Sequence, residues 1–303
     1  MTMPVADLVP VCVAHCTADT AQQHEADGSP TWITRGANFV VAVTAVHPGT
    51  ILSRSGQADD YMVILPVGMQ AELSGGGQNL LAGDDSLAIV PPGDSRVKAG
   101  AAGHVVRIFS TAARDLTALA QNAAHYGPDL NLPENIAPLA GHSLRQFRMA
   151  DYPRVGNALI QPRIFRSGNL MVNLFHVFDQ LRPTTELRPH WHDDFDQGSL
   201  GLAGRWLHHI RTPWGSDIEQ WRDDQHLEVA SPSLTIIPPT MIHASRNLDP
   251  DSRLVDIFAP PRVDFLRSGI VINAAEYPAP PADAASTDRD VPQDWQKVGR
   301  ATT

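Results

Sequence analysis

The sequence predicts an all-β protein in which one barrel-like or sandwich-like unit occurs twice in tandem. Alternating apolar stretches such as residues 39–46 and 170–177 are separated by turns rich in Gly, Pro, Asn and Asp, a pattern typical of short strands. The 25 prolines and 22 glycines among 303 residues favour many short strands over long helices. The third observation is that the chain repeats itself.

Three pairs of segments recur in the same order. "RGANFVVAVTAV" begins at Arg35, and "RSGNLMVNLFHV" begins 131 residues later at Arg166. "IVPPGDSR" and "IIPPTMIH" are 147 residues apart, and "VVRIFS" and "LVDIFA" are 149 residues apart. Because the order is kept and the offsets only grow, we infer two copies of one unit, the second enlarged by longer loops.

The repeat divides the chain into four parts. Residues 1–110 are expected to form the first barrel and residues 146–277 the second. Residues 111–145 connect them, and we expect a helix there because "STAARDLTALAQNAAHY" has helical spacing and begins with a serine and a threonine as N-cap candidates. Residues 278–303 are rich in Pro and Ala and are expected to be a tail, either loose or packed onto the second barrel.

Charge and hydropathy exclude several classes of partner. The chain has 33 acidic and 23 basic residues, a net charge of -10, and no basic patch to neutralise a phosphate backbone. No apolar stretch is long enough to span a membrane, and the start "MTMPVADLVP" lacks the basic region of a secretory signal. We therefore expect a cytoplasmic protein with neither a nucleic-acid nor a membrane partner, whose Cys12 and Cys16 are ordinary reduced thiols.

The strongest motif lies in the second copy. His190 and His192 are one residue apart, so on a strand both imidazoles point to the same face. Gln197 follows after a short excursion, and His243 comes from a later strand. Three imidazole nitrogens and one amide oxygen suit a divalent metal such as Fe(II), Mn(II), Ni(II), Cu(II) or Zn(II). The alternative is four core residues satisfied by local hydrogen bonds, which the motif spacing makes the weaker interpretation.

This arrangement resembles the cupin superfamily. Its first motif has two histidines one residue apart, an acid or amide, and then a glycine, here Gly204; its second has a proline turn, a histidine and an asparagine, here Asn247. The resemblance covers both motifs of the second copy and, through the repeat, most of the chain. It implies two tandem double-stranded β-helix, or jelly-roll, barrels joined by a helical linker, with metal in the second. Thr240 departs from the pattern by replacing the expected turn glycine.

The first copy lacks this motif. Counting back from Gly68 gives Tyr61, Gly56 and Arg54 in place of the glutamine and the two neighbouring histidines, and Arg96 is aligned with the later histidine. Arginine is always protonated and has no lone pair for a metal. We expect a degenerate barrel used for packing and dimer contacts; the alternative is that the two arginines converge on an anion.

The resemblance also directs the functional hypothesis. Cupins with a three-histidine iron centre commonly are dioxygenases, so the first hypothesis is an Fe(II) dioxygenase that uses O2 on a small chelating organic acid, dicarbonyl or phenolic substrate. The second is a non-redox lyase, isomerase or hydrolase using Mn, Ni or Zn. The third is a metal-dependent ligand-binding or sensor protein. A homodimer is expected in each case.

Other residues are candidates for the surroundings of the metal. One of His208 and His209 faces inward, because neighbours on a strand alternate, and it is a candidate general base or further ligand. His176, Trp206 and Trp221 are candidates for the substrate pocket, although tryptophans also pack barrel mouths.

Three acids, Asp193, Asp194 and Asp196, lie in the loop between the histidines and the glutamine. Their place in a loop between strands favours a solvated or supporting role over direct ligation.

Overall fold

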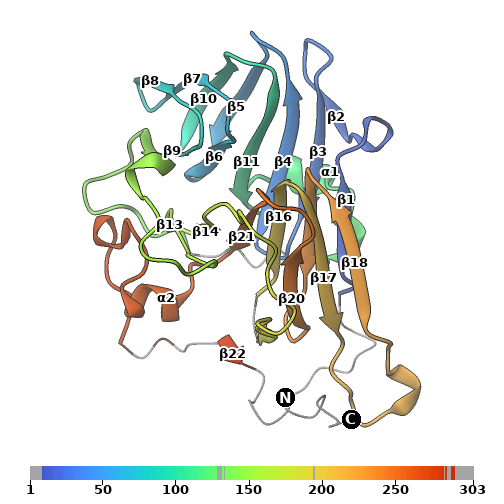
Figure 1. Cartoon of the computed structure of the whole chain (residues 1–303). Helices are drawn as coiled ribbons and strands as arrows, with labels where there is room; N and C mark the ends of the chain where they lie inside the picture. Colours follow the sequence, from blue (N-terminus) through green and yellow to red (C-terminus); the bar gives the residue numbers. More distant parts are fainter. Residues whose placement is uncertain are drawn as a thin grey trace.

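The computed structural model describes residues 9–127, 132, 134–193, 195–282, 284 and 288–290, and most regular structure in that part of the chain is β-strand (Figure 1). The all-β prediction is confirmed. Four antiparallel sheets are formed, two by mostly N-terminal strands and two by mostly C-terminal strands.

The N-terminal pair consists of a seven-stranded and a four-stranded sheet. The larger has the order β12 (Arg145–Arg148), β9 (Ser86–Val90), β6 (Tyr61–Leu65), β11 (Gly103–Ser110), β4 (Phe39–Val46), β3 (Pro30–Arg35) and β2 (Gln23–His24). The smaller has the order β5 (Ile51–Gln57), β10 (Gly93–Ala99), β7 (Ala71–Gly75) and β8 (Gln78–Ala82).

The C-terminal pair consists of a six-stranded and a five-stranded sheet. The first has the order β1 (Cys12–His15), β19 (Ser233–Ile237), β16 (Gln197–Ala203), β21 (Arg253–Phe258), β14 (Met171–Leu174) and β13 (Ile164–Arg166). The second has the order β18 (Gln225–Ala230), β17 (Arg205–Arg211), β20 (Ile242–Asn247), β15 (His190–His192) and β22 (Asp288–Asp290). Apart from β22, whose backbone pairs with β15, and residues 278–282 and 284, the expected tail lies outside the described residues.

Helices are short. The linker contains α1 (Arg114–Leu119) and a 3₁₀ turn (Ala123–His125), so the expected helix is present in reduced form. Its N-cap is Ala113, because Ser110 still belongs to β11. The others are α2 (Val263–Ser268) and 3₁₀ turns at Ala18–Thr20, Met149–Asp151, Ile218–Gln220 and Ala274–Glu276. Among the described residues, no helix is long and apolar enough to cross a membrane.

The two copies exchange edge strands. β1, which precedes the first copy, pairs with β19 of the second, with Cys12 opposite Ile236. β12, which precedes the second copy, pairs with β9 of the first, with Arg145 opposite Ile89. A cut at any single residue would therefore leave a strand on the sheet of the other copy, and the boundaries drawn from the sequence stay a prediction.

The internal repeat is visible in matched hydrogen bonds. The backbone N–H of Arg35 donates to Oδ1 of Asn122 at 3.0 Å, and Nδ2 of Asn122 donates to the Arg35 carbonyl at 2.8 Å. In the second copy, Arg166 and Asn273 form the same reciprocal pair at 2.9 and 2.8 Å. The two arginines are 131 residues apart and the two asparagines 151, and these equivalent pairs support duplication of a single unit.

Each copy also binds an aspartate from the other. Asp196 of the second copy accepts from the backbone N–H of Ala37 at 2.6 Å and from the hydroxyl of Tyr126 at 2.8 Å. Asp60 of the first copy accepts from the backbone N–H of Gly168 at 3.3 Å. Because Asp196 is 3% exposed and directed at the first copy, its role is to join the two barrels.

The cores explain why one barrel is filled and the other has room. A large apolar cluster lies between the copies and includes Phe39, Phe165 and Leu200. A second cluster around Tyr61 and Phe109 is formed from residues of the first barrel and its linker. The second barrel has three smaller clusters in place of one, which leaves space among its strands for polar side chains.

Candidate metal centre

Three histidines meet inside the second barrel. His190 and His192 project from β15, and His243 projects from β20, where it lies directly opposite His190. One ligand nitrogen from each lies within 4.8 Å of the others, and no other group of three or more His, Cys, Asp or Glu in the described part of the chain is so arranged. His192 and His243 are 2% and 3% exposed, while His190 is half-buried. The cluster is therefore closed on the side of the core.

Gln197, the first residue of β16, completes the set. Its Oε1 lies 2.9 Å from Nε2 of His192 and 3.3 Å from Nε2 of His243. Two ligands about 2.1 Å from one ion lie about 3.0–3.4 Å apart when the angle between them is right or tetrahedral. The observed separations come close to these values, so the residues fit a shared divalent ion.

Backbone carbonyls orient two of the imidazoles. Nδ1 of His190 donates to the Arg188 carbonyl at 3.0 Å, and Nδ1 of His243 donates to the Met241 carbonyl at 2.9 Å. A carbonyl can only accept, so this contact fixes the tautomer and leaves the Nε2 lone pair for the centre. Burial, with the neighbouring histidines, holds the pKa of His243 well below its usual value. The ring is therefore neutral at neutral pH, as a metal ligand must be.

A hydrogen-bonded chain orients the glutamine. Nε2 of Gln197 donates to Oγ of Ser199 at 3.1 Å, and Oγ of Ser199 donates to Oδ1 of Asp256 at 2.8 Å. Because the amide nitrogen is committed to Ser199, the amide oxygen faces the histidines. Burial raises the pKa of Asp256 to about 6, which places a carboxyl that exchanges protons near neutral pH beside the cluster.

A cavity of about 160 Å³ borders the cluster. His190, Gln197, His243 and Asp256 line it, together with the apolar side chains of Phe175, Phe178, Trp206 and Leu254. Trp206 is 1% exposed and meets Phe178 edge-on, with the ring centroids 5.1 Å apart. Three of the four candidate donors thus line a largely apolar space.

The two motif turns have left-handed backbone. Gly204 has φ +77°, and a Cβ there would lie 2.0 Å from Oγ of Ser252, so only glycine fits. Thr240 has φ +69°, although a side chain branched at Cβ is rare in that region. Its backbone N–H donates to the His192 carbonyl at 2.6 Å, which ties the turn to the ligand strand. The expected turn geometry is present despite the missing glycine.

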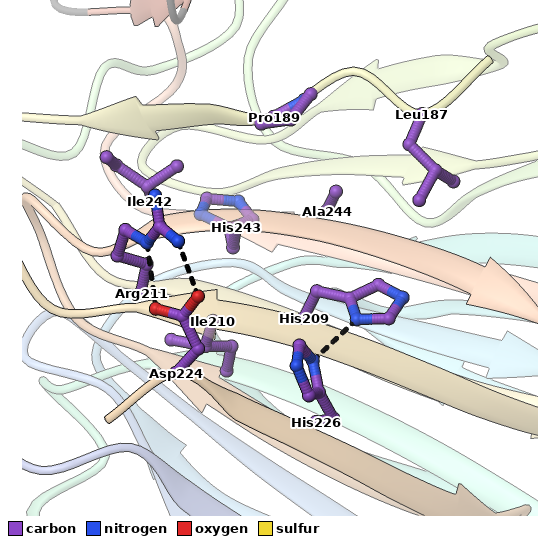
Figure 2. A pocket seen from close by; sticks show the side chains of 10 residues that line it. All are labelled: Leu187, Pro189, His209, Ile210, Arg211, Asp224, His226, Ile242, His243 and Ala244. Carbon is purple, nitrogen blue, oxygen red and sulfur yellow. Dashed lines mark hydrogen bonds and ion pairs between the residues drawn. The ribbon is translucent and has the colours of Figure 1, made fainter. Parts of the chain in front are cut away.

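His208 and His209 point in opposite directions. His208 is 1% exposed and contacts Oγ of Ser245 through Nδ1 at 2.7 Å, while burial lowers its pKa to about 4. His209 lies on the outer face of the sheet, where its Nδ1 is 2.8 Å from Nδ1 of His226 (Figure 2). These two rings and the Arg211–Asp224 ion pair border a second hollow of about 310 Å³, which shares His243 and Ala244 with the cavity at the cluster. The inward residue is therefore His208.

The predicted pocket residues separate likewise. Trp206 lines the cavity, whereas Trp221 stacks on Trp214, with the ring centroids 4.2 Å apart, in the connection between β17 and β18. His176 follows β14 and is not among the residues that line the cavity; burial, followed by the nearby Arg163, lowers its pKa to about 4. Of the loop acids, Asp193 accepts from the indole N–H of Trp191 at 3.0 Å, and Asp194 lies outside the described residues.

The first barrel differs from the alignment made on sequence at one position. A register shift between Gly93 and Ser95 places Ser95 opposite Arg54, the pairing that His243 makes with His190 in the second copy. Ser95 is 8% exposed, whereas Arg96 is exposed on the opposite face of the strand. The prediction that Arg96 replaces His243 is wrong, because the shift moves every later side chain by one place.

The remaining positions of the first barrel are committed to packing. The hydroxyl of Tyr61 lies 3.0 Å from Oγ of Ser95, and its ring stacks on Phe109. Arg54 pairs with Asp115 at 2.6 Å. Arg54 and Arg96 do not converge on one point, so the anion-binding alternative for this barrel loses its support.

Sequence reasoning missed several residues that face the candidate site. Arg188 lies two residues before His190, so strand alternation alone would have placed both on one face. Asp256, Arg182 and Phe178 come from other strands and loops, and no local pattern in the sequence links them to the histidines.

Comparison with known proteins gives a fold. No protein-family model matches the chain, and no curated protein is significantly similar to it in sequence. Among solved structures, the coconut allergen cocosin matches with a TM-score of 0.55 and 11% identity, over 91% of this chain and 99% of that one. The Lactobacillus farciminis oxalate decarboxylase formate complex matches with a TM-score of 0.50 and 11% identity, over 84% and 92%.

A variant of the Bacillus subtilis oxalate decarboxylase gives a similar result, with a TM-score of 0.50 and 12% identity over 82% of this chain and 79% of that one. At such low identity these matches define the fold alone. The chain has the cupin fold, and because the likeness extends over both copies it is a bicupin, with two jelly-roll barrels in one chain.

Proposed function

We propose that this bicupin is a metal-dependent enzyme acting on a small chelating anion in its second barrel. His190, His192, His243 and Gln197 would hold one divalent ion. The observation that carries the proposal is the arrangement of four uncharged donors around one point, next to a cavity of about 160 Å³. Because no ligand is charged, a bound ion keeps its double positive charge, which favours an anionic substrate.

The preferred reaction is an Fe(II)-dependent dioxygenation. A three-histidine iron centre supplies redox chemistry with O2, and the chain itself supplies orientation and exclusion of water. Phe175, Phe178 and Trp206 would shield the substrate, and Ser199 would keep the amide oxygen of Gln197 directed at the ion. An apolar cavity of this kind would favour the oxygen-consuming reaction, because it limits side reactions with water.

Asp256 favours a second candidate, a non-redox lyase, isomerase or hydrolase using Mn(II), Ni(II) or Zn(II). This carboxyl is buried, lines the cavity, and has a pKa raised to about 6 by burial. A group that holds a proton near neutral pH is suited to general acid–base catalysis. The solved structures with the same fold include oxalate decarboxylases, but they share only the fold with this chain.

Oxygen dependence separates these candidates. The protein is purified without air, loaded with Fe(II), Mn(II), Ni(II) or Zn(II) in turn, and screened with dicarbonyls and phenolic acids. An Fe(II) dioxygenase consumes O2 only in the iron form and only with substrate present. Turnover under argon with Mn(II), Ni(II) or Zn(II) would favour the non-redox reaction. Ligand binding without turnover under either atmosphere would leave a ligand-binding or sensor protein as the surviving hypothesis.

Assembly and location are the remaining predictions. A homodimer would be ordinary for this fold and is tested by light scattering across a range of concentrations. Cytoplasmic location stays an expectation from the sequence.

A further inference from the structure

Two arginines share the cavity with the candidate metal ligands. Arg182 and Arg188 come from the segment that leads into β15, and both line the cavity beside His190. Arg182 is half-buried and Arg188 is exposed, so the two guanidinium groups extend from the interior of the cavity toward solvent. Neither belongs to the donor set described above.

Arg182 is held in place without being neutralised. Its Nη1 donates to the Ser245 carbonyl at 2.9 Å, and its Nη2 donates to the Glu186 carbonyl at 3.0 Å. Carbonyl oxygens orient a guanidinium but carry no full negative charge. Among the described residues, no carboxylate lies within ion-pair distance of Arg182 or Arg188, whereas the buried Arg262, which acts electrostatically on Asp256, pairs with Asp264. A desolvated cation of this kind is suited to an anion that arrives with the ligand.

The charges around the cavity favour an anion. Asp256 is the carboxylate among the lining residues, and its Oδ1 already accepts from the hydroxyl of Ser199 at 2.8 Å. The Glu186 side chain acts on Arg182 from beyond ion-pair distance, and Arg188 acts on it with the opposite sign. Two permanent positive charges and one carboxylate thus line the cavity, before any metal ion is added.

The rest of the wall sets the size and polarity of the ligand. Ile160, Phe175, Phe178, Trp206 and Leu254 contribute apolar surface. A cavity of about 150 Å³ lined by apolar side chains accommodates one benzene ring. The cavity here is about 160 Å³, so its apolar part holds a single ring or a branched chain of similar size.

We propose that Arg182 and Arg188 bind the carboxylate of a small hydrophobic carboxylic acid whose body packs against Phe178 and Trp206. This deepens the proposed function, because the acid would reach the metal from the same cavity. Two bidentate guanidinium contacts distinguish a planar carboxylate from a neutral amide of the same shape. Substrates of this class therefore carry a carboxylate and no more than one ring or a short branched chain.

Calorimetric titration with matched probes tests the proposal. Benzoate and 3-methylbutanoate are compared with benzamide and 3-methylbutanamide, on metal-free and on Mn(II)-loaded protein. At least one acid binds the wild type about 10-fold or more tightly than its amide, since a hydrogen bond to a charged group is lost in the amide. Equal binding of acids and amides, or no binding of either acid, overturns the proposal.

Variants locate the binding. Arg188→Gln and Arg182→Gln each weaken binding of the acid about 10-fold while leaving the amide unchanged, and Arg182→Lys lies between. Arg211→Gln is the matched control, since Arg211 pairs with Asp224 outside this cavity. Because Arg182 also donates to two backbone carbonyls, its replacement could disturb the fold. The exposed Arg188 is therefore the safer position for this test. Acid selectivity that survives in both glutamine variants overturns the proposal.

Comparison of metal-free with metal-loaded protein separates this inference from the proposed function. Acid selectivity in metal-free protein that cannot be loaded with any metal would contradict the enzyme hypothesis and support the arginine site. Metal binding without acid selectivity would do the reverse.

Discussion

At the scale of single residues, three of the four candidate ligands, namely His190, His243 and Gln197, are each oriented by a hydrogen bond to a second group. Arg188 and Met241 present carbonyls to the two imidazoles, and Ser199 presents its hydroxyl to the amide. Such supporting contacts orient ligand atoms before an ion binds. The consequence is that residues which never touch the ion affect its affinity.

Ser199→Ala and Asp256→Asn are expected to weaken metal binding about 10- to 100-fold, because the amide of Gln197 loses its orientation. Competition with a chelator of known affinity measures the effect. Ser95→Ala is the control, since Ser95 is a buried serine of the first barrel whose hydroxyl lies 3.0 Å from that of Tyr61. If Ser199→Ala binds metal as tightly as the wild type, the hydrogen-bonded chain has no role in the site.

Acid is expected to destabilise the metal-free protein partly through His208. Burial lowers the pKa of His208 from 6.5 to about 4, so between these values the unfolded chain binds a proton that the folded chain refuses. The stability that the protein has with His208 neutral is fully present above pH 6.5. It is lost as the pH falls toward about 4, with a slope in the free energy of unfolding of up to about 1.4 kcal/mol per pH unit. Asp256, whose pKa is raised, opposes this trend below about pH 6.

Urea unfolding between pH 4.5 and 7.5 tests this account. His208→Gln should show a shallower loss of the free energy of unfolding on acidification than the wild type. His24→Gln, at an exposed position on β2, should keep the wild-type slope. An unchanged slope in His208→Gln would show that His208 takes up its proton equally in both states.

At the scale of elements, the turn after β16 joins the strand of Gln197 to β17, which pairs with the strand of His243. Gly204 lies between β16 and β17 at φ +77°, and the side chain of Ser252 occupies the space that a Cβ would need. Gly68, its counterpart, has φ +84° with nothing within 4 Å. The two glycines thus share a backbone conformation and differ in their surroundings.

Gly204→Ala is expected to destabilise the protein by about 2–4 kcal/mol, the sum of a left-handed backbone and a steric overlap. Gly68→Ala is expected to cost about 1 kcal/mol, from the backbone alone. Urea denaturation of both variants gives the comparison. Equal losses would mean that the loop around Ser252 shifts at little cost.

Prediction from sequence succeeded where the signal was local. Alternation placed His190 and His192 on one face, and the repeat indicated two β units. It failed by one residue at Arg96, because the alignment took no account of the register shift between Gly93 and Ser95, although a glycine within a strand often marks a bulge. The exchange of β1 was also beyond reach, since pairing between Cys12 and Ile236 depends on contacts more than two hundred residues apart. Arg182 and Asp256 were missed for the same reason.

At the scale of the whole molecule, the first barrel supports the second. Asp196 and Asp60 cross between the copies, strands are exchanged, and an apolar cluster lies between them. The interior of the first barrel is filled by side chains such as Tyr61 and Phe109, whereas the second keeps a cavity. Of the two copies, the first thus serves as a packed scaffold and the second carries the candidate reaction site.

The central claim is that one divalent ion binds per chain, between His190, His192, His243 and Gln197. Elemental analysis of anaerobically purified and metal-reconstituted protein tests it most directly. The account predicts one equivalent for the wild type and none for His192→Ala or His243→Ala, with circular dichroism confirming that both variants stay folded. A wild type that cannot be loaded, a variant that keeps its ion, or a second equivalent bound in the first barrel would contradict it.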